Sequence, residues 1–203
     1  SPVFNSLLEF NPETADPMDI RGDLAESWEQ TDDLTYVFHL NKQAKWHDGV
    51  PVTAEDIVFS LDGAVCVDCN GLDNLQGPSR TGSIYIDNFY TAGNARAIDE
   101  HTVEVKTDMP APAFIPTLSL DVIKMLPKHT VIGEGKTQGM KRPQDFNGSG
   151  PFIHQKYTKD VMNEYEANPN YWKEGYPRID GMRHVVMIDS GTQIAAFQTE
   201  QVM

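Results

Sequence analysis

Hydrophobic and polar positions alternate most clearly between residues 34 and 40. The apolar positions of this segment are Leu34, Tyr36, Phe38 and Leu40, and they alternate with Thr35, Val37 and His39. A period of two places one set of side chains on each face of an extended chain, so the pattern predicts a β-strand with one apolar face.

A turn and a capped helix are expected directly after this strand. Asp48-Gly49 favours a turn, because glycine adopts positive φ angles without steric cost. Thr53 stands at a typical N-cap position, and Asp56 three residues later supplies the partner of a capping box. The segment from Ile57 to Leu61 then begins an apolar helix face.

The rest of the chain contains further predicted elements separated by turns. Residues 1–12 are expected to form a short helix or turn, residues 11–20 a loop, and Leu24, Ala25 and Trp28 a buried corner. Further along, we expect a strand over 101–107 after a turn at 97–99, a helix through 112–120, a hairpin from 152–157 and 161–167, a strand over 182–188, and a helix beginning near Gly191.

Six ordered motifs resemble one large protein family. The segments VFNSLLEFNP, DLAESWEQTDDLTYVFHL, WHDGVPVTAEDIVFSL and NGSGPF followed by NPNYW carry most of the likeness. Shorter matches are AID with TV near residue 100, and PAF and LPKH near residues 112–129. Together they are similar to the extracytoplasmic solute-binding proteins, family 5, of peptide- and nickel-type ABC importers.

The resemblance implies a fold class of α/β (mixed α+β) with the architecture of a periplasmic-binding-protein lobe. Residues 1–52 and 148–203 would form a mixed-sheet core, and residues 53–147 a smaller inserted subdomain. The resemblance also implies a second lobe after Met203. The apolar helical pattern near the end of the chain stops without a helix-breaking residue, which indicates a fragment cut inside or just after a helix. Solute would then lie in a cleft between two lobes that closes on binding.

The function implied by this resemblance is that of the substrate-binding component of an ABC importer. It would capture a peptide or a similar small solute and deliver it to a membrane permease, in the periplasm or at the extracytoplasmic surface of a prokaryote. A receptor for a nickel chelate or an oligosaccharide is the alternative within the family. Neither role requires catalysis or a cofactor.

Charge and hydropathy exclude several other classes. The chain has 30 Asp and Glu against 16 Lys and Arg, a formal net charge of −14, and the basic residues are scattered. Nucleic-acid binding and attraction to anionic membranes are therefore not expected. No apolar run approaches the roughly 20 residues of a membrane helix, so direct insertion is not expected, although a signal peptide or lipid anchor upstream of Ser1 is compatible with the sequence.

Two segments suggest chemistry of a different class. Cys66 and Cys69 form a C-x-x-C that could be a structural disulfide, a pair of inert thiols, or a redox or metal site. His47 and Asp48 could act as an acid/base pair, which would make the chain a secreted hydrolase or redox domain. We favour the disulfide for the cysteines and a turn for His47-Asp48, and expect no metal site or catalytic residue.

Solute contacts are expected from loops at the edge of the cleft. By resemblance, Asn5 and Ser6 in the amino-terminal segment are candidates, and Tyr90 could stack on a ligand or belong to a local core. The other candidates follow the capped helix: Asn70, Asp73, Asn74 and Gln76. The turn at 148–151 could bind an anion through backbone N–H groups or simply return the chain tightly to the core.

Overall fold

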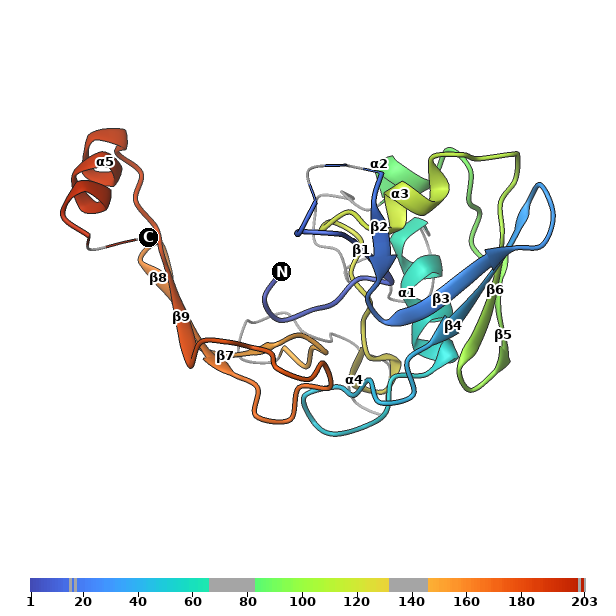
Figure 1. The fold of residues 1–203 in the computed structure, drawn as a ribbon, viewed down its shortest axis with the longest axis horizontal. Helices are drawn as coiled ribbons and strands as arrows, with labels where there is room; N and C mark the ends of the chain where they lie inside the picture. Colours follow the sequence, from blue (N-terminus) through green and yellow to red (C-terminus); the bar gives the residue numbers. More distant parts are fainter. Residues whose placement is uncertain (15, 17, 66–82, 132–145, 201, 203) are drawn as a thin grey trace.

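A computed structural model of the chain contains three antiparallel sheets and five helices in the part that it describes, which is residues 1–14, 16, 18–65, 83–131, 146–200 and 202. Figure 1 shows a main body that holds the first two sheets and most of the helices. The third sheet starts at this body and projects away from it, with the last helix at its far end.

The centre of the main body is a four-stranded sheet. Its order is β3 (Ala25–Gln30), β4 (Thr35–Leu40), β6 (Thr102–Lys106) and β5 (Ala95–Asp99), and every neighbouring pair is antiparallel. The predicted strand is confirmed as β4, in which Tyr36, Phe38 and Leu40 are buried. The alternating apolar side chains of β4 therefore lie on the face that contacts the core, as expected.

Helix α1 (Ala54–Val65) covers this sheet, and its cap is confirmed. The Asp56 carboxylate accepts hydrogen bonds from the Thr53 backbone N–H at 2.9 Å and from the Thr53 hydroxyl at 3.0 Å. Ile57 and Leu61 are fully buried on the face that packs against the sheet. The second oxygen of Asp56 accepts from the backbone N–H of Lys128 at 2.8 Å, which ties the start of α4 (Lys128–Val131) to α1.

The short helices complete the hydrophobic core beside the sheet. Helix α2 spans Ser83–Ile86, and α3 spans Phe114–Leu118, which is shorter than the predicted 112–120. The Phe114 ring lies at the centre of an aromatic cluster, with ring centroids 5.0 Å from Tyr36, 6.5 Å from Phe38 and 5.8 Å from Phe89. Edge-on and tilted contacts of this kind stabilise aromatic cores.

The amino-terminal segment differs from the prediction of a helix or turn. Leu8–Phe10 forms β1 and pairs with β2 (Ile20–Gly22) in an antiparallel two-stranded sheet. Leu7 and Leu8 are adjacent and both fully buried. The sequence therefore lacks the alternation of apolar and polar positions by which a strand is recognised. The burial predicted for Leu24 and Ala25 is confirmed, but the predicted corner was wrong, because Ala25–Gln30 is strand β3.

The carboxy-terminal part follows the predicted order. Strands β7 (Phe152–Thr158) and β8 (Met162–Ala167) form the expected hairpin, and β9 (Gly181–Val185) adds a third antiparallel strand. Helix α5 (Ser190–Gln198) begins at Asp189, whose side chain accepts from the Thr192 backbone N–H at 2.8 Å. Most side chains of β9 and α5 are exposed, as their projection from the body requires.

The segment before β7 returns the chain tightly to the amino terminus. The Gly150 N–H donates to the carbonyl of Val3 at 2.8 Å, and a Cβ atom placed on Gly148 would lie only 1.8 Å from that same carbonyl oxygen. Backbone approaches backbone here, so glycine is required at Gly148. This contact agrees with the packing interpretation of the 148–151 turn.

The mixed α/β class is confirmed, whereas the mixed sheet is not seen, since all strand pairs in the described residues are antiparallel. The proposed division at residues 53 and 147 stays a prediction. The four-stranded sheet crosses the boundary at residue 53, because β4 precedes this residue and its partner β6 follows it.

Among the described helices, none combines the length and the apolar character of a membrane span.

Candidate functional site

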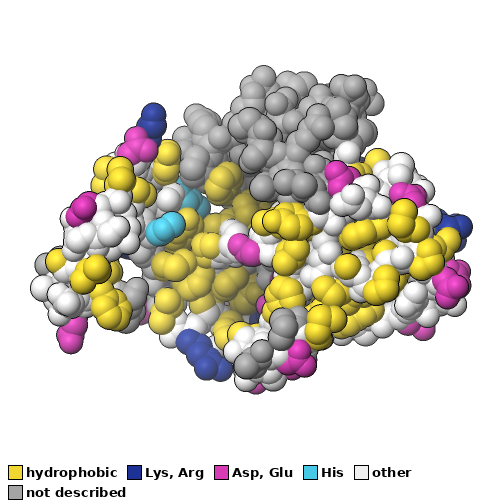
Figure 2. Space-filling view, turned by 90° about the horizontal axis from the view of Figure 1, so that it is seen from above, with side chains coloured by type: hydrophobic (Ala, Val, Ile, Leu, Met, Phe, Trp, Pro, Cys, Tyr) yellow, Lys and Arg dark blue, Asp and Glu magenta, His cyan; other side chains and the backbone are white. Residues whose placement is uncertain are grey.

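A cavity of about 580 Å³ lies where the amino-terminal segment meets the segment that links β8 to β9. We call it the Asn5 cavity. Figure 2 shows hydrophobic side chains gathered in the hollow between the projecting sheet and the main body. The cavity is lined by Ser1, Phe4, Asn5, Ser6, Glu9, Arg21, Asp23, Ser119, Asp121, Lys124, Pro151, Phe152, Tyr171, Lys173, Tyr176, Pro177, Arg178 and Ile179.

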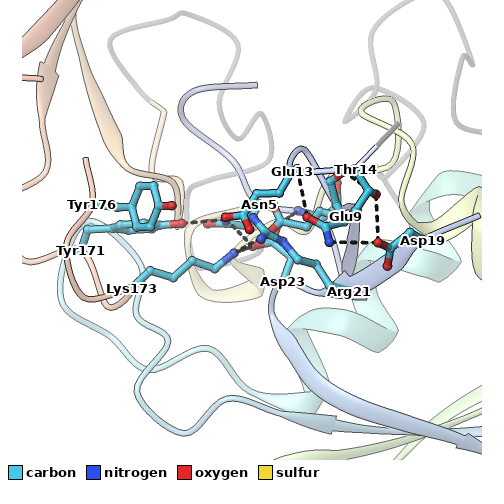
Figure 3. A network of polar contacts seen from close by, with 12 residues as sticks. Asn5, Glu9, Glu13, Thr14, Asp19, Arg21, Asp23, Tyr171, Lys173 and Tyr176 are labelled. Carbon is cyan, nitrogen blue, oxygen red and sulfur yellow. Dashed lines mark hydrogen bonds and ion pairs between the residues drawn. The ribbon is translucent and has the colours of Figure 1, made fainter. Parts of the chain in front are cut away.

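Asp23 is the buried centre of a polar network on one wall of the cavity (Figure 3). Its carboxylate accepts from Asn5 Nδ2 at 2.7 Å, from the Ser6 backbone N–H at 2.9 Å and from Lys173 Nζ at 2.7 Å. Burial raises the pKa of Asp23 above its ordinary value, although the Lys173 ammonium opposes this effect. The network therefore joins the amino-terminal segment to the segment between β8 and β9 at one carboxylate.

Lys173 connects Asp23 to a second carboxylate. Its ammonium lies 3.0 Å from Glu9 Oε1 and also stands over the Trp172 ring, 5.1 Å from the ring centroid. Burial lowers the pKa of Lys173, but the attraction and hydrogen bond of Asp23, together with Tyr171 and Glu9, outweigh it, so the pKa is raised. Lys173 is therefore charged in the cavity wall at neutral pH.

Asn5 carries an unsatisfied hydrogen-bond acceptor. Its amide nitrogen donates to Asp23 and, at 3.1 Å, to the hydroxyl of Tyr171, whereas its Oδ1 atom is buried and has no partner in the structure. Burial raises the pKa of Tyr171 to about 12, so this phenol keeps its proton at neutral pH. A buried acceptor without a donor costs free energy unless another group, such as a ligand, supplies one.

The lining of the cavity contains a second, smaller polar group. Lys124 Nζ donates to the Ser6 hydroxyl at 3.0 Å and forms an ion pair with Asp121 at 2.5 Å. The amino group of Ser1 also contacts Asp121. Ser6 connects the two polar groups, because its backbone N–H donates to Asp23 and its hydroxyl accepts from Lys124.

Only some of the predicted solute-binding residues lie in this cavity. Asn5 and Ser6 line it, as the prediction requires, although a solute-binding role for them stays a prediction. Tyr90 does not line it: its ring is buried in the hydrophobic core and its hydroxyl donates to Asp62 at 2.5 Å. The predicted Asn70, Asp73, Asn74 and Gln76 lie outside the described residues.

The residues suspected of catalysis do not converge. His47 Nε2 lies 3.0 Å from the carbonyl of Gly150, whereas the Asp48 carboxylate contacts His129 Nε2 at 2.7 Å. Gly49 follows with a φ of 87°, which confirms the turn. Cys66 and Cys69 lie outside the described residues, so their pairing stays a prediction. Within the described part of the chain, no cluster of three or more His, Cys, Asp or Glu could hold a metal ion.

Sequence reasoning missed the residues that organise the cavity. Lys173 and Arg21 were counted only among the scattered basic residues, Asp23 was not singled out, and Tyr171 was noted only as part of the NPNYW motif. Asp23 and Lys173 are 150 positions apart, so no local pattern connects them. The weak signal was Asp23 itself, an acid placed directly before the buried Leu24 and Ala25.

Comparison with known proteins gives the family. A model of the bacterial extracellular solute-binding proteins, family 5, matches residues 19–203. The chain belongs to this family. The fold of the family-5 chain also matches the solved structure of HbpA2 from Haemophilus parasuis, with a TM-score of 0.82 and 25% identity over 98% of this chain and 40% of that one.

Curated relatives of the family-5 chain are peptide-binding proteins by name. A Brucella abortus protein, provisionally named an ABC transporter peptide-binding protein, is 33% identical over 90% of this chain and 32% of its own length. The dipeptide-binding protein of Escherichia coli is 30% identical over 98% of this chain and 38% of its own length. The family-5 chain thus spans about a third of the length of these relatives.

Proposed function

We propose that the protein is the substrate-binding component of an ABC importer and that it captures a peptide or a similar small solute for a membrane permease. Family membership and the names of the relatives support this role. The size of the Asn5 cavity also supports this role, because its volume of about 580 Å³ falls within the range of small-molecule binding sites.

One observation carries the assignment of the site to this cavity. Asn5 lines the cavity, and its Oδ1 atom is buried and lacks a hydrogen-bond donor in the structure. A peptide offers backbone N–H groups in every residue, so it could satisfy this acceptor. The rigid setting of Asn5, held by Asp23 and Tyr171, would hold the acceptor in place before the solute arrives.

The same proposal includes location and partners. The protein would act outside the cytoplasm, in the periplasm or at the cell surface, and would bind solute without chemical conversion. A second lobe, supplied by the remainder of a protein of the relatives' length, would close over the cavity. The chain of residues 1–203 alone would then bind solute more weakly than the longer protein, which calorimetry with a captured solute can compare.

Native mass spectrometry tests the proposal directly. The full-length protein, purified without refolding, should carry a bound solute whose mass identifies a peptide, a metal chelate or an oligosaccharide. Asn5→Ala should lose this solute, whereas Asn94→Ala should retain it, because Asn94 bonds Asp108 in a turn remote from the cavity. Thermal unfolding of both variants controls for misfolding. Absence of solute from the wild-type protein, also after incubation with a mixture of short peptides, would contradict the proposed function.

A further inference from the structure

We propose that the Asn5 cavity receives a carboxylate of the solute at Arg21 and Arg178, next to an N–H group that donates to Asn5. The solute end that fits is the carboxyl end of a peptide or of an acylated amino acid. This inference rests on the proposed function and adds which end of the solute this cavity takes.

The first argument is the local charge of the cavity. The whole chain has a net charge of −14. The cavity nevertheless contains four cationic side chains against three carboxylates, so its wall is net positive where the rest of the protein is acidic. The cations are Arg21, Lys124, Lys173 and Arg178, and the carboxylates are Glu9, Asp23 and Asp121. Such a site attracts an anionic group and disfavours a cationic one.

The second argument is that every one of these carboxylates already has a cation. Asp23 and Glu9 share Lys173, and Asp121 is paired with Lys124. A positively charged end of a solute would therefore have to compete with an internal ion pair. The charges that are left available belong to the two arginines.

The two arginines are only partly engaged. Arg21 uses its Nε atom for Glu9 at 2.9 Å, while its two terminal nitrogens donate to no residue in the described ranges. The Arg178 guanidinium stacks on Tyr176 at 5.0 Å from the ring centroid, with a weak 3.4 Å contact to its hydroxyl, and no carboxylate of the described chain pairs with it. Planar guanidinium groups bind carboxylates through two parallel hydrogen bonds.

The third argument is the position of the unsatisfied acceptor. Asn5 is 7% exposed, and Figure 3 shows it in the same network around Asp23 as Arg21. A ligand that engages both residues must present an N–H donor and a carboxylate. The last residue of a peptide has both groups, separated only by its α-carbon.

Two probes that differ in one group test the inference. N-acetylalanine and N-acetylalaninamide should be titrated into the full-length protein, with binding followed by protein NMR shifts. The carboxylate probe should bind about tenfold more tightly or better, since hydrogen bonds to charged groups are the stronger ones. Arg21→Gln should reduce this ratio to below about threefold, whereas Arg96→Gln should leave it unchanged, because Arg96 pairs with Glu104 on the remote sheet.

Several outcomes would overturn the inference: equal binding of both probes, no binding of either, or a ratio unchanged in Arg21→Gln. Arg178→Gln is the second variant and must also lower the ratio, which keeps the test decisive if Arg21→Gln fails to fold. The proposed function is judged separately by native mass spectrometry. Solute capture without a carboxylate preference refutes only this inference, whereas a protein that captures no solute refutes both.

Discussion

Replacing Lys173 by methionine should destabilise the protein through the charge that it leaves behind. The side chain of Asp23 is 5% exposed and that of Lys173 is 24% exposed. Loss of one partner of a fully buried ion pair costs about 3–5 kcal/mol. Since water reaches part of Lys173, we expect a smaller loss, about 2–3 kcal/mol of unfolding free energy at pH 7, which corresponds to a melting temperature lower by about 5–10 °C.

The pH dependence distinguishes this explanation from simple loss of packing. The pKa of Asp23 is already raised by burial, and removal of Lys173 raises it further. The penalty exists only while Asp23 is ionised, so it should shrink as pH falls from 7 toward 4. Urea unfolding at several pH values measures this change. A second variant, Asp23→Asn combined with Lys173→Met, should recover at least about 1 kcal/mol at pH 7 because it removes the unpaired charge.

The matched control is Lys128→Met, which breaks an exposed ion pair with Glu55 and should cost less than about 1 kcal/mol. If Lys173→Met costs no more than this control at pH 7, or if its cost is the same at pH 4 and pH 7, the reasoning about a buried charge is refuted.

Three further predictions concern other contacts. Gly148→Ala should prevent stable folding or lower the melting temperature strongly, since the added Cβ would overlap the Val3 carbonyl. A melting temperature within 2 °C of wild type, which corresponds to a loss of roughly 1 kcal/mol or less of unfolding free energy, would contradict this close approach. The pKa of Tyr171 is about 12 in the folded protein and about 10 in the unfolded chain. The folded state therefore binds the phenol proton more tightly, and the free energy of unfolding should fall as pH rises from about 10 to 12. In thermal melts, Tyr171→Phe should make this fall less steep. Asp56→Ala should cost about 2–3 kcal/mol in urea unfolding, since four donors on Thr53, Trp46 and Lys128 lose their acceptor. Glu55→Ala at the exposed neighbouring position should cost less than about 1 kcal/mol; equal costs would refute the capping role.

Local patterns predicted the elements whose signal lies within a few residues. The alternation from Leu34 to Leu40 gave β4, and Thr53 with Asp56 gave the start of α1. Strand β3 was missed because Ala25 is its only buried residue, so no alternation of apolar side chains marks it. Its extended conformation depends on pairing with β4, which is tertiary information.

The candidate site was less predictable than the fold. Asn5 and Ser6 were found through a resemblance, but their partners Asp23 and Lys173 were not. Charged residues are usually exposed, so a sequence gives no reason to expect either one inside. Tyr90 shows the opposite error, because an aromatic residue in an irregular segment suggested a ligand contact and is instead a core residue bonded to Asp62.

The distance along the chain between Asp23 and Lys173 has a consequence for biosynthesis. The two residues are 150 positions apart, so a ribosome that adds about 5–20 residues per second leaves Asp23 without its counterion for roughly 8–30 s. Strands β3 and β4, joined by a short turn, can pair long before that moment. The Asn5 cavity should therefore be among the last features of the chain to form, and a truncated translation product would contain the sheet without the site.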